Sequence, residues 1–72
     1  MYYYVAFRSN SEGYIWEYNL YADEMEHLMS WIYDEMILYP DKILYSMQLK
    51  SASDFDPSTV ICVDKYYDRS VC

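Results

Sequence analysis

The first part of the chain alternates hydrophobic and polar positions in the way that a β-hairpin does. Tyr2 to Ser9 is rich in strand-forming residues and runs into Asn-Ser-Glu-Gly, which ends with Gly13, the only glycine. In the following run, Tyr14 to Tyr21, Trp16 and Leu20 fall on the same face. The pattern therefore predicts two antiparallel strands joined by a tight turn.

The hydrophobic period changes after this hairpin, and the pattern from Asp23 to Tyr39 predicts a helix. Its apolar residues recur at intervals of three and four positions, so they form one stripe. Asp23 is expected to cap the helix together with Glu26, three residues later, and Pro40 is expected to end it. The stripe consists of Met25, Leu28, Met29, Ile32, Met36 and Tyr39.

Two further strands are expected after the helix, at Lys42 to Leu49 and at Thr59 to Asp64. Residues 51–58 form the loop between them, and residues 66–72 either extend the last strand or form a flexible tail. The order ββαββ predicts one α+β domain over residues 1–72, in which a small antiparallel sheet carries the helix on one face.

One helix covers only one face of such a sheet, so the other face is expected to show aromatic residues to solvent. Tyr2, Tyr4 and Tyr21 are the candidates, since all three alternate with the inward-facing positions. An exposed aromatic face is a candidate interface. With eleven tyrosines in 72 residues, it also indicates a homodimer or a partner-bound state.

The charge pattern adds a candidate binding surface. Eight of the twelve acidic residues lie between Ser9 and Asp41, where there is no lysine or arginine, and the whole chain carries a formal charge of −7. This charge argues against direct binding to nucleic acid or to an anionic membrane, and it favours a basic protein partner. The residues expected to bind that partner are Glu17, Asp23, Glu24, Glu26, Trp31, Asp34, Glu35 and Leu38.

The sequence offers little for catalysis, and we expect neither an enzyme nor a cofactor. His27 is the only histidine and is interpreted as a solvated helix residue, because a general base also needs a pocket and a nucleophile. Asp54 and Asp56 lack the glycine and the bidentate glutamate of a calcium loop, so no metal site is predicted. With a single glycine, a phosphate-binding loop of the usual kind is also excluded.

The cysteines and the N-terminus bear on location. Cys62 and Cys72 have neither redox-motif nor zinc spacing, so free thiols in a reducing compartment are favoured, with a disulfide tying the tail to a strand as the alternative. The chain has no signal-peptide pattern and no stretch near the ~20 apolar residues that a membrane span needs. We therefore expect a cytoplasmic protein.

In general character the chain resembles the small acidic inhibitors that bacteriophages encode against host enzymes. The segment Gly13-Tyr-Ile-Trp-Glu-Tyr, the acidic helix and Lys42-Ile-Leu-Tyr follow the element order of the smaller DNA-mimicking inhibitors of uracil-DNA glycosylase, and anti-CRISPR proteins are similar in size and charge. The resemblance implies a non-enzymatic protein that occupies the basic surface of a nucleic-acid-handling host enzyme. The alternative is a homodimeric adaptor or structural phage protein that uses the aromatic sheet face.

Overall fold

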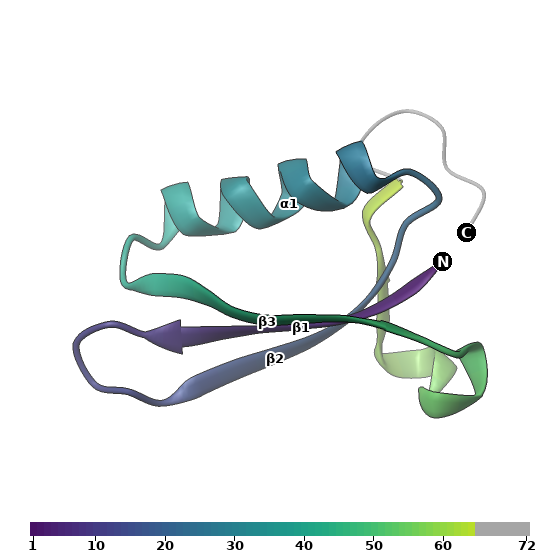
Figure 1. The fold of residues 1–72 in the computed structure, drawn as a ribbon, viewed down its shortest axis with the longest axis horizontal. Helices are drawn as coiled ribbons and strands as arrows, with labels where there is room; N and C mark the ends of the chain where they lie inside the picture. Colours follow the sequence, from purple (N-terminus) through teal and green to yellow (C-terminus); the bar gives the residue numbers. More distant parts are fainter. Residues whose placement is uncertain (65–72) are drawn as a thin grey trace.

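The part of the chain that the structure describes forms one four-stranded sheet with one helix on one face (Figure 1). The computed structural model describes residues 1–64, so the tail expected at 66–72 lies outside the described residues. The elements follow the predicted ββαββ order and confirm the α+β class. They are β1 (Tyr2–Ser9), β2 (Ile15–Tyr21), α1 (Met25–Leu38), β3 (Lys42–Lys50) and β4 (Val60–Cys62), with short 3-10 turns at Ala52–Asp54 and Pro57–Thr59 before β4.

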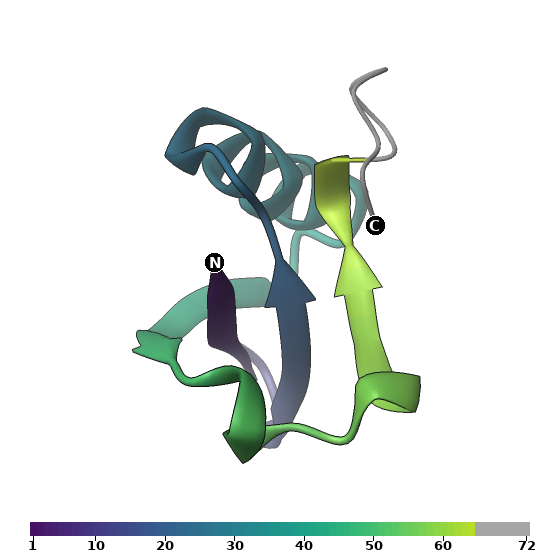
Figure 2. The same ribbon diagram turned by 90° about the vertical axis from the view of Figure 1, so that its right-hand side faces the viewer.

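The sheet has the order β3-β1-β2-β4, and it is mixed rather than purely antiparallel. β1 pairs antiparallel with β2, as predicted, and also with β3, but β4 runs parallel to β2. Figure 2 shows β2 and β4 side by side and pointing the same way. The prediction of an all-antiparallel sheet is therefore wrong at β4, because the long connection through the two 3-10 turns carries the chain across to the far edge.

The core lies between α1 and the face of the sheet that it covers. Phe7 from β1, Leu20 from β2, and Leu28 and Ile32 from α1 are all fully buried. Their positions follow from the sequence patterns, since Phe7 and Leu20 lie on inward faces of strands and Leu28 and Ile32 are one helical turn apart. Val63, just after β4, closes the core from the far edge.

The start of α1 differs from the predicted capping box. The helix begins at Met25 after Glu24, whose side chain makes no cap hydrogen bond. Asp23 instead accepts a hydrogen bond from the Tyr21 hydroxyl at 2.5 Å. The capping box that does form lies in the 3-10 turn directly after β3, where the Ser51 hydroxyl accepts a hydrogen bond from the Ser53 backbone N–H.

The turn between β1 and β2 is held by a small polar network. Gly13 has φ of +84°, a left-handed conformation that favours glycine. Asp41, just before β3, accepts hydrogen bonds from the Ser9 hydroxyl at 2.6 Å and from the Ser11 backbone N–H at 3.0 Å. The network ties the hairpin tip to the start of β3, and it explains why buried Ser9 is tolerated.

Candidate protein-binding surface

The solvent side of α1 collects most of the carboxylates expected to bind a partner. Glu24, Glu26 and Asp34 are exposed, and Asp23 is exposed in the turn just before them. The helix contains no lysine or arginine. Glu26 and Asp34 make no hydrogen bond or ion pair with any described residue, so their charge is available to a partner.

Large apolar side chains lie between these carboxylates. Tyr33, Ile37 and Leu38 are 55%, 73% and 68% exposed, which is unusual for residues of this size. On a helix with 100° per residue, they span one continuous arc with Asp34 inside it. We call Glu26, Tyr33, Asp34, Ile37 and Leu38 the outer surface of α1. Of the apolar residues on this surface, only Leu38 was predicted to bind a partner. Tyr33 and Ile37 could have been found from their position on the flank of the helix opposite the sheet.

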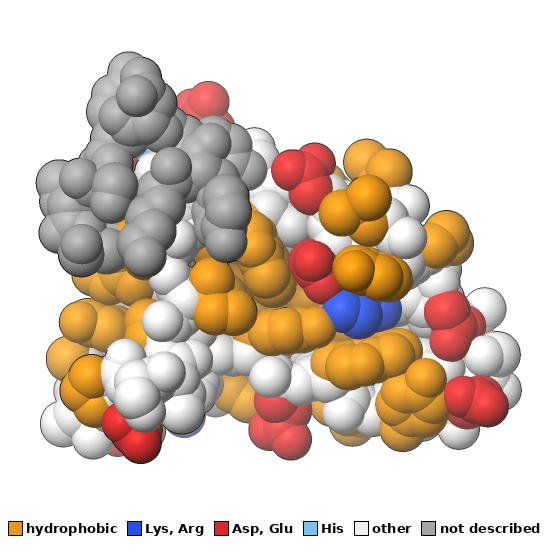
Figure 3. All heavy atoms as spheres, turned by 180° about the vertical axis from the view of Figure 1, so that it is seen from behind, with side chains coloured by type: hydrophobic (Ala, Val, Ile, Leu, Met, Phe, Trp, Pro, Cys, Tyr) orange, Lys and Arg blue, Asp and Glu red, His pale blue; other side chains and the backbone are white. Residues whose placement is uncertain are grey.

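Glu17 lies away from this surface. It projects from β2 onto the sheet face that α1 does not cover, where its carboxylate accepts a hydrogen bond from the Tyr4 hydroxyl at 3.0 Å. That hydrogen bond is the main reason why the pKa of Tyr4 is raised. The structure therefore does not bring Glu17 together with the carboxylates of α1, and Figure 3 shows acidic side chains lying apart from one another on one face of the molecule.

Glu35 was also predicted to bind a partner, but its carboxylate is already paired within the fold and is less available than those of Glu26 and Asp34. Its carboxylate forms an ion pair with the Lys42 ammonium at 2.8 Å, and its side chain is only 18% exposed. The carboxylate-rich segment from Ser9 to Asp41 therefore has a positively charged partner just outside it. Lys42 lies seven positions after Glu35, beyond Pro40, which ends the helix. The ion pair joins α1 to the start of β3.

The Lys42 ammonium is surrounded by aromatic rings, and the residue is only 7% exposed. It donates a hydrogen bond to the Tyr18 hydroxyl at 2.6 Å. It lies 4.6–5.7 Å from the centroids of four rings, which belong to Phe7, Trp16, Tyr18 and Tyr39. Figure 3 shows a basic side chain surrounded by hydrophobic ones in this way. Burial alone would lower the pKa of Lys42, but the hydrogen bonds to Glu35 and Tyr18 outweigh it and raise that pKa.

Trp31 belongs to the core rather than to the binding surface. Its ring packs against Tyr18 at 5.3 Å and against Phe7 at 6.2 Å, and the residue is half-buried. Its prediction as an exposed binding residue is wrong, because Tyr18 of β2 packs against that side of α1 and makes the buried side of the helix wider than the apolar stripe.

The aromatic residues of the uncovered sheet face are half-buried rather than fully exposed. Tyr2 packs edge-on against Tyr21 with ring centroids 5.0 Å apart, and Phe55 from the loop before β4 approaches Tyr2 at 6.2 Å. A hydrogen bond to Asp23 is the main cause that raises the pKa of Tyr21 to about 12. These rings therefore pack partly against one another, and the aromatic surface that stays exposed is smaller than the sequence predicted.

His27 is buried, so its interpretation as a solvated residue is wrong. It is 9% exposed, and its Nδ1 lies 2.9 Å from a carboxylate oxygen of Asp64. Its Nε2 lies 3.4 Å from Glu24. The other Asp64 oxygen accepts the Asp23 backbone N–H at 2.9 Å. Burial would raise the pKa of Asp64, but the hydrogen bonds from His27 and Asp23 hold it below its ordinary value. The pair clamps the start of α1 to the segment after β4.

Cys62 is disulfide-bonded, which contradicts the favoured interpretation of a free thiol. Cys72, the only other cysteine of the sequence, lies outside the described residues. Among the residues that the structure describes, no three His, Cys, Asp or Glu side chains are grouped so that they could hold a metal ion. Nor is any described helix both long and apolar enough to span a bilayer.

Comparisons with known proteins add no identification. A scan against protein-family models, a search of curated proteins and a search of solved structures each returned no match.

Proposed function

We propose that this protein is a non-enzymatic inhibitor that binds a basic, nucleic-acid-handling host protein through the outer surface of α1. One observation carries the proposal: a helix face on which exposed carboxylates and exposed large apolar side chains alternate, with no lysine or arginine on the helix. A solvated face needs only the charges, and it gains nothing from exposing Tyr33 and Ile37. A partner groove that is both basic and apolar fits such a face.

The two kinds of side chain have different roles in this proposal. Exposed ion pairs contribute only about 0–1 kcal/mol each, so Glu26 and Asp34 mainly steer the approach and exclude acidic partners. Tyr33 and Ile37 supply the affinity, because truncation of an aromatic or aliphatic anchor in an interface costs about 2 kcal/mol or more at a hot spot. This is recognition of a helix by a groove.

The spacing of the carboxylates refines the idea of DNA mimicry. Glu26 and Asp34 are eight residues apart, which is about 12 Å along a helix. A nucleic-acid strand carries one phosphate for each ~3.4 Å of rise. The outer surface of α1 therefore replaces a few phosphate contacts of the target, and apolar contacts supply the remaining affinity.

Inhibition of a bacterial enzyme by a phage protein would place this chain in the host cytoplasm. The disulfide at Cys62 is a feature of oxidising environments, so the proposal requires that binding also occurs after reduction. The outer surface of α1 contains no cysteine, which is compatible with that requirement.

The test is a pull-down from bacterial lysate under reducing conditions, followed by elution with a salt gradient and titration of the captured protein. Asp34→Lys should weaken binding and flatten its dependence on salt, whereas Ile37→Ala should weaken binding with the dependence unchanged. Glu12→Lys is the matched control, because it makes the same charge change at an exposed position in the hairpin turn. Equal effects of Asp34→Lys and Glu12→Lys would show that only net charge matters and would refute the proposed surface.

A further inference from the structure

β3 forms an edge of the sheet that is long, apolar and uncovered by any described residue. It lies outside β1 in the order β3-β1-β2-β4, so its outward backbone groups face no strand among residues 1–64. Four of its nine residues are large, exposed and apolar: Ile43, Tyr45, Met47 and Leu49, with Leu49 at 63%. Such an edge is a template for pairing with another strand.

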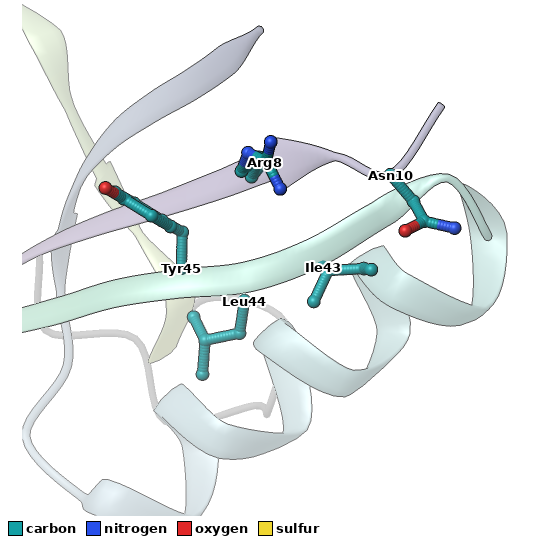
Figure 4. Close-up of a pocket in the computed structure, with 5 residues that line it drawn as sticks. All are labelled: Arg8, Asn10, Ile43, Leu44 and Tyr45. Atoms are coloured by element: carbon teal, nitrogen blue, oxygen red, sulfur yellow. The ribbon is translucent and has the colours of Figure 1, made fainter. Parts of the chain in front are cut away.

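A bulge gives β3 a symmetric pattern of facing positions. Its pairing with β1 shifts by one residue between Ala6 and Phe7, which leaves Tyr45 as the extra residue. In Figure 4, Leu44 points toward α1 and Tyr45 points away from it. The residues of β3 paired with the buried side of β1 are Lys42, Leu44, Met47 and Leu49.

This set of four positions maps onto itself under a two-fold axis placed between Tyr45 and Ser46. In that antiparallel register, Leu44 lies opposite Met47 of a second copy, and Lys42 lies opposite Leu49. Each residue that faces α1 therefore meets another residue facing the same side. In a strand without the bulge, a two-fold axis between two neighbouring residues would place side chains of opposite faces against each other. Isologous pairing requires this kind of self-complementarity.

The charges on the edge also suit a second copy. β3 contains two lysines and no acid, although the chain as a whole carries −7, so two copies can meet here without opposing their carboxylates. Lys42 is already neutralised by Glu35. In the two-fold register Lys50 lies opposite Asp41 of the second copy, and this favourable pair occurs twice.

We propose that two copies of this chain form a homodimer by antiparallel pairing of their β3 strands about an axis between Tyr45 and Ser46. The pairing would extend the sheet across both copies and cover Met47 and Leu49, which α1 leaves exposed. This inference is independent of the proposed function. It also differs from a dimer through the aromatic sheet face, where Tyr2, Tyr21 and Phe55 already pack on one another.

The experiment is sedimentation equilibrium of the full chain over a range of micromolar concentrations. The wild type is expected to dimerise. Leu49→Lys replaces an apolar side chain that the pairing would cover with a charged one that it would desolvate, so it should raise the dimer dissociation constant by about tenfold or more. Ile15→Lys is the control, because Ile15 is also an exposed apolar residue (45%) but lies on β2, which β1 separates from β3, so dimerisation should be unchanged.

Lys50→Asp provides a second variant that leaves the apolar surface intact. The substitution places an acidic side chain opposite Asp41 of the second copy, so it should weaken the dimer as well. Circular dichroism and urea unfolding establish that each variant is folded. A wild type that stays monomeric overturns the proposal, and so does a dimer that both folded variants leave intact. A monomer that instead captures an extended peptide along β3 would assign the edge to a different protein and would also overturn it.

Discussion

Lys42→Met is expected to destabilise this domain strongly. The substitution keeps most of the apolar stem but removes an ammonium that two oxygens and four aromatic rings surround. Glu35 would keep its charge at 18% side-chain exposure with its cation gone. The Tyr18 hydroxyl would lose the donor at 2.6 Å.

The magnitude follows from these contacts. Removal of one partner of a buried ion pair costs about 3–5 kcal/mol, because the other charge is left uncompensated. Glu35 is partly exposed, so the lower end applies, and the lost cation–π contacts add about 0.5–2 kcal/mol. We therefore expect a loss of about 3.5–5 kcal/mol. A domain of this length has a total stability of about 4–11 kcal/mol, so the variant should be only marginally folded.

Urea unfolding followed by tryptophan fluorescence measures this loss, because Trp16 stacks against the Lys42 ammonium. Lys50→Met at low protein concentration is the control, since Lys50 lies on the same strand and forms no ion pair with a described residue. The double variant Lys42→Met/Glu35→Met should recover most of the stability, because it replaces both charges with apolar side chains. A loss below about 0.5 kcal/mol for Lys42→Met would refute the reasoning, since that is the cost of an ordinary surface substitution.

Three further measurements test other parts of the structure. Hydrogen bonds depress the pKa of Asp41, Asp56 and Asp64. The stabilisation that these carboxylates provide is therefore present above the ordinary carboxyl pKa and is lost as the pH falls through the depressed values. Acid unfolding, followed by circular dichroism, should set in below about pH 4. Gly13→Ala should cost about 1–2 kcal/mol in urea unfolding because φ is +84°, and an unchanged midpoint would contradict the left-handed turn. Reduction with dithiothreitol should lower the free energy of unfolding by about 2–4 kcal/mol if the disulfide at Cys62 is structural, and equal midpoints with and without reductant would exclude that role.

The parts of the fold that depend on local pattern could be predicted from the sequence. The hairpin, α1 and β3 appear within one or two residues of their expected bounds, because alternation, helical periodicity, Gly13 and Pro40 each act over a few positions. The core face of β1 and β2 followed from the same alternation. The exposed carboxylates Glu26 and Asp34 were also predicted, since charged residues on the outer side of a helix stay in water.

The parts that depend on distant contacts could not be predicted in this way. The parallel pairing of β4 with β2 needs the path of the loop after β3, which no local pattern encodes. His27 is buried only because Asp64, 37 positions later, supplies a carboxylate beside α1. Glu35 likewise forms an ion pair with Lys42, which lies beyond the end of the helix. In each case a polar residue was assigned to solvent because its partner lay elsewhere in the chain.

The same contacts decide how the net charge of −7 should be interpreted. Glu35 and Asp64 are bonded within the fold, so they add to the formal charge but offer little to a partner. Glu26 and Asp34 carry charge that the described fold does not use. Loss of binding after substitution of Glu35 or Asp64 would therefore report unfolding, whereas loss of binding in a folded Asp34 variant would report recognition. The total charge of the chain does not distinguish these two outcomes, but the hydrogen-bond partners of each carboxylate do.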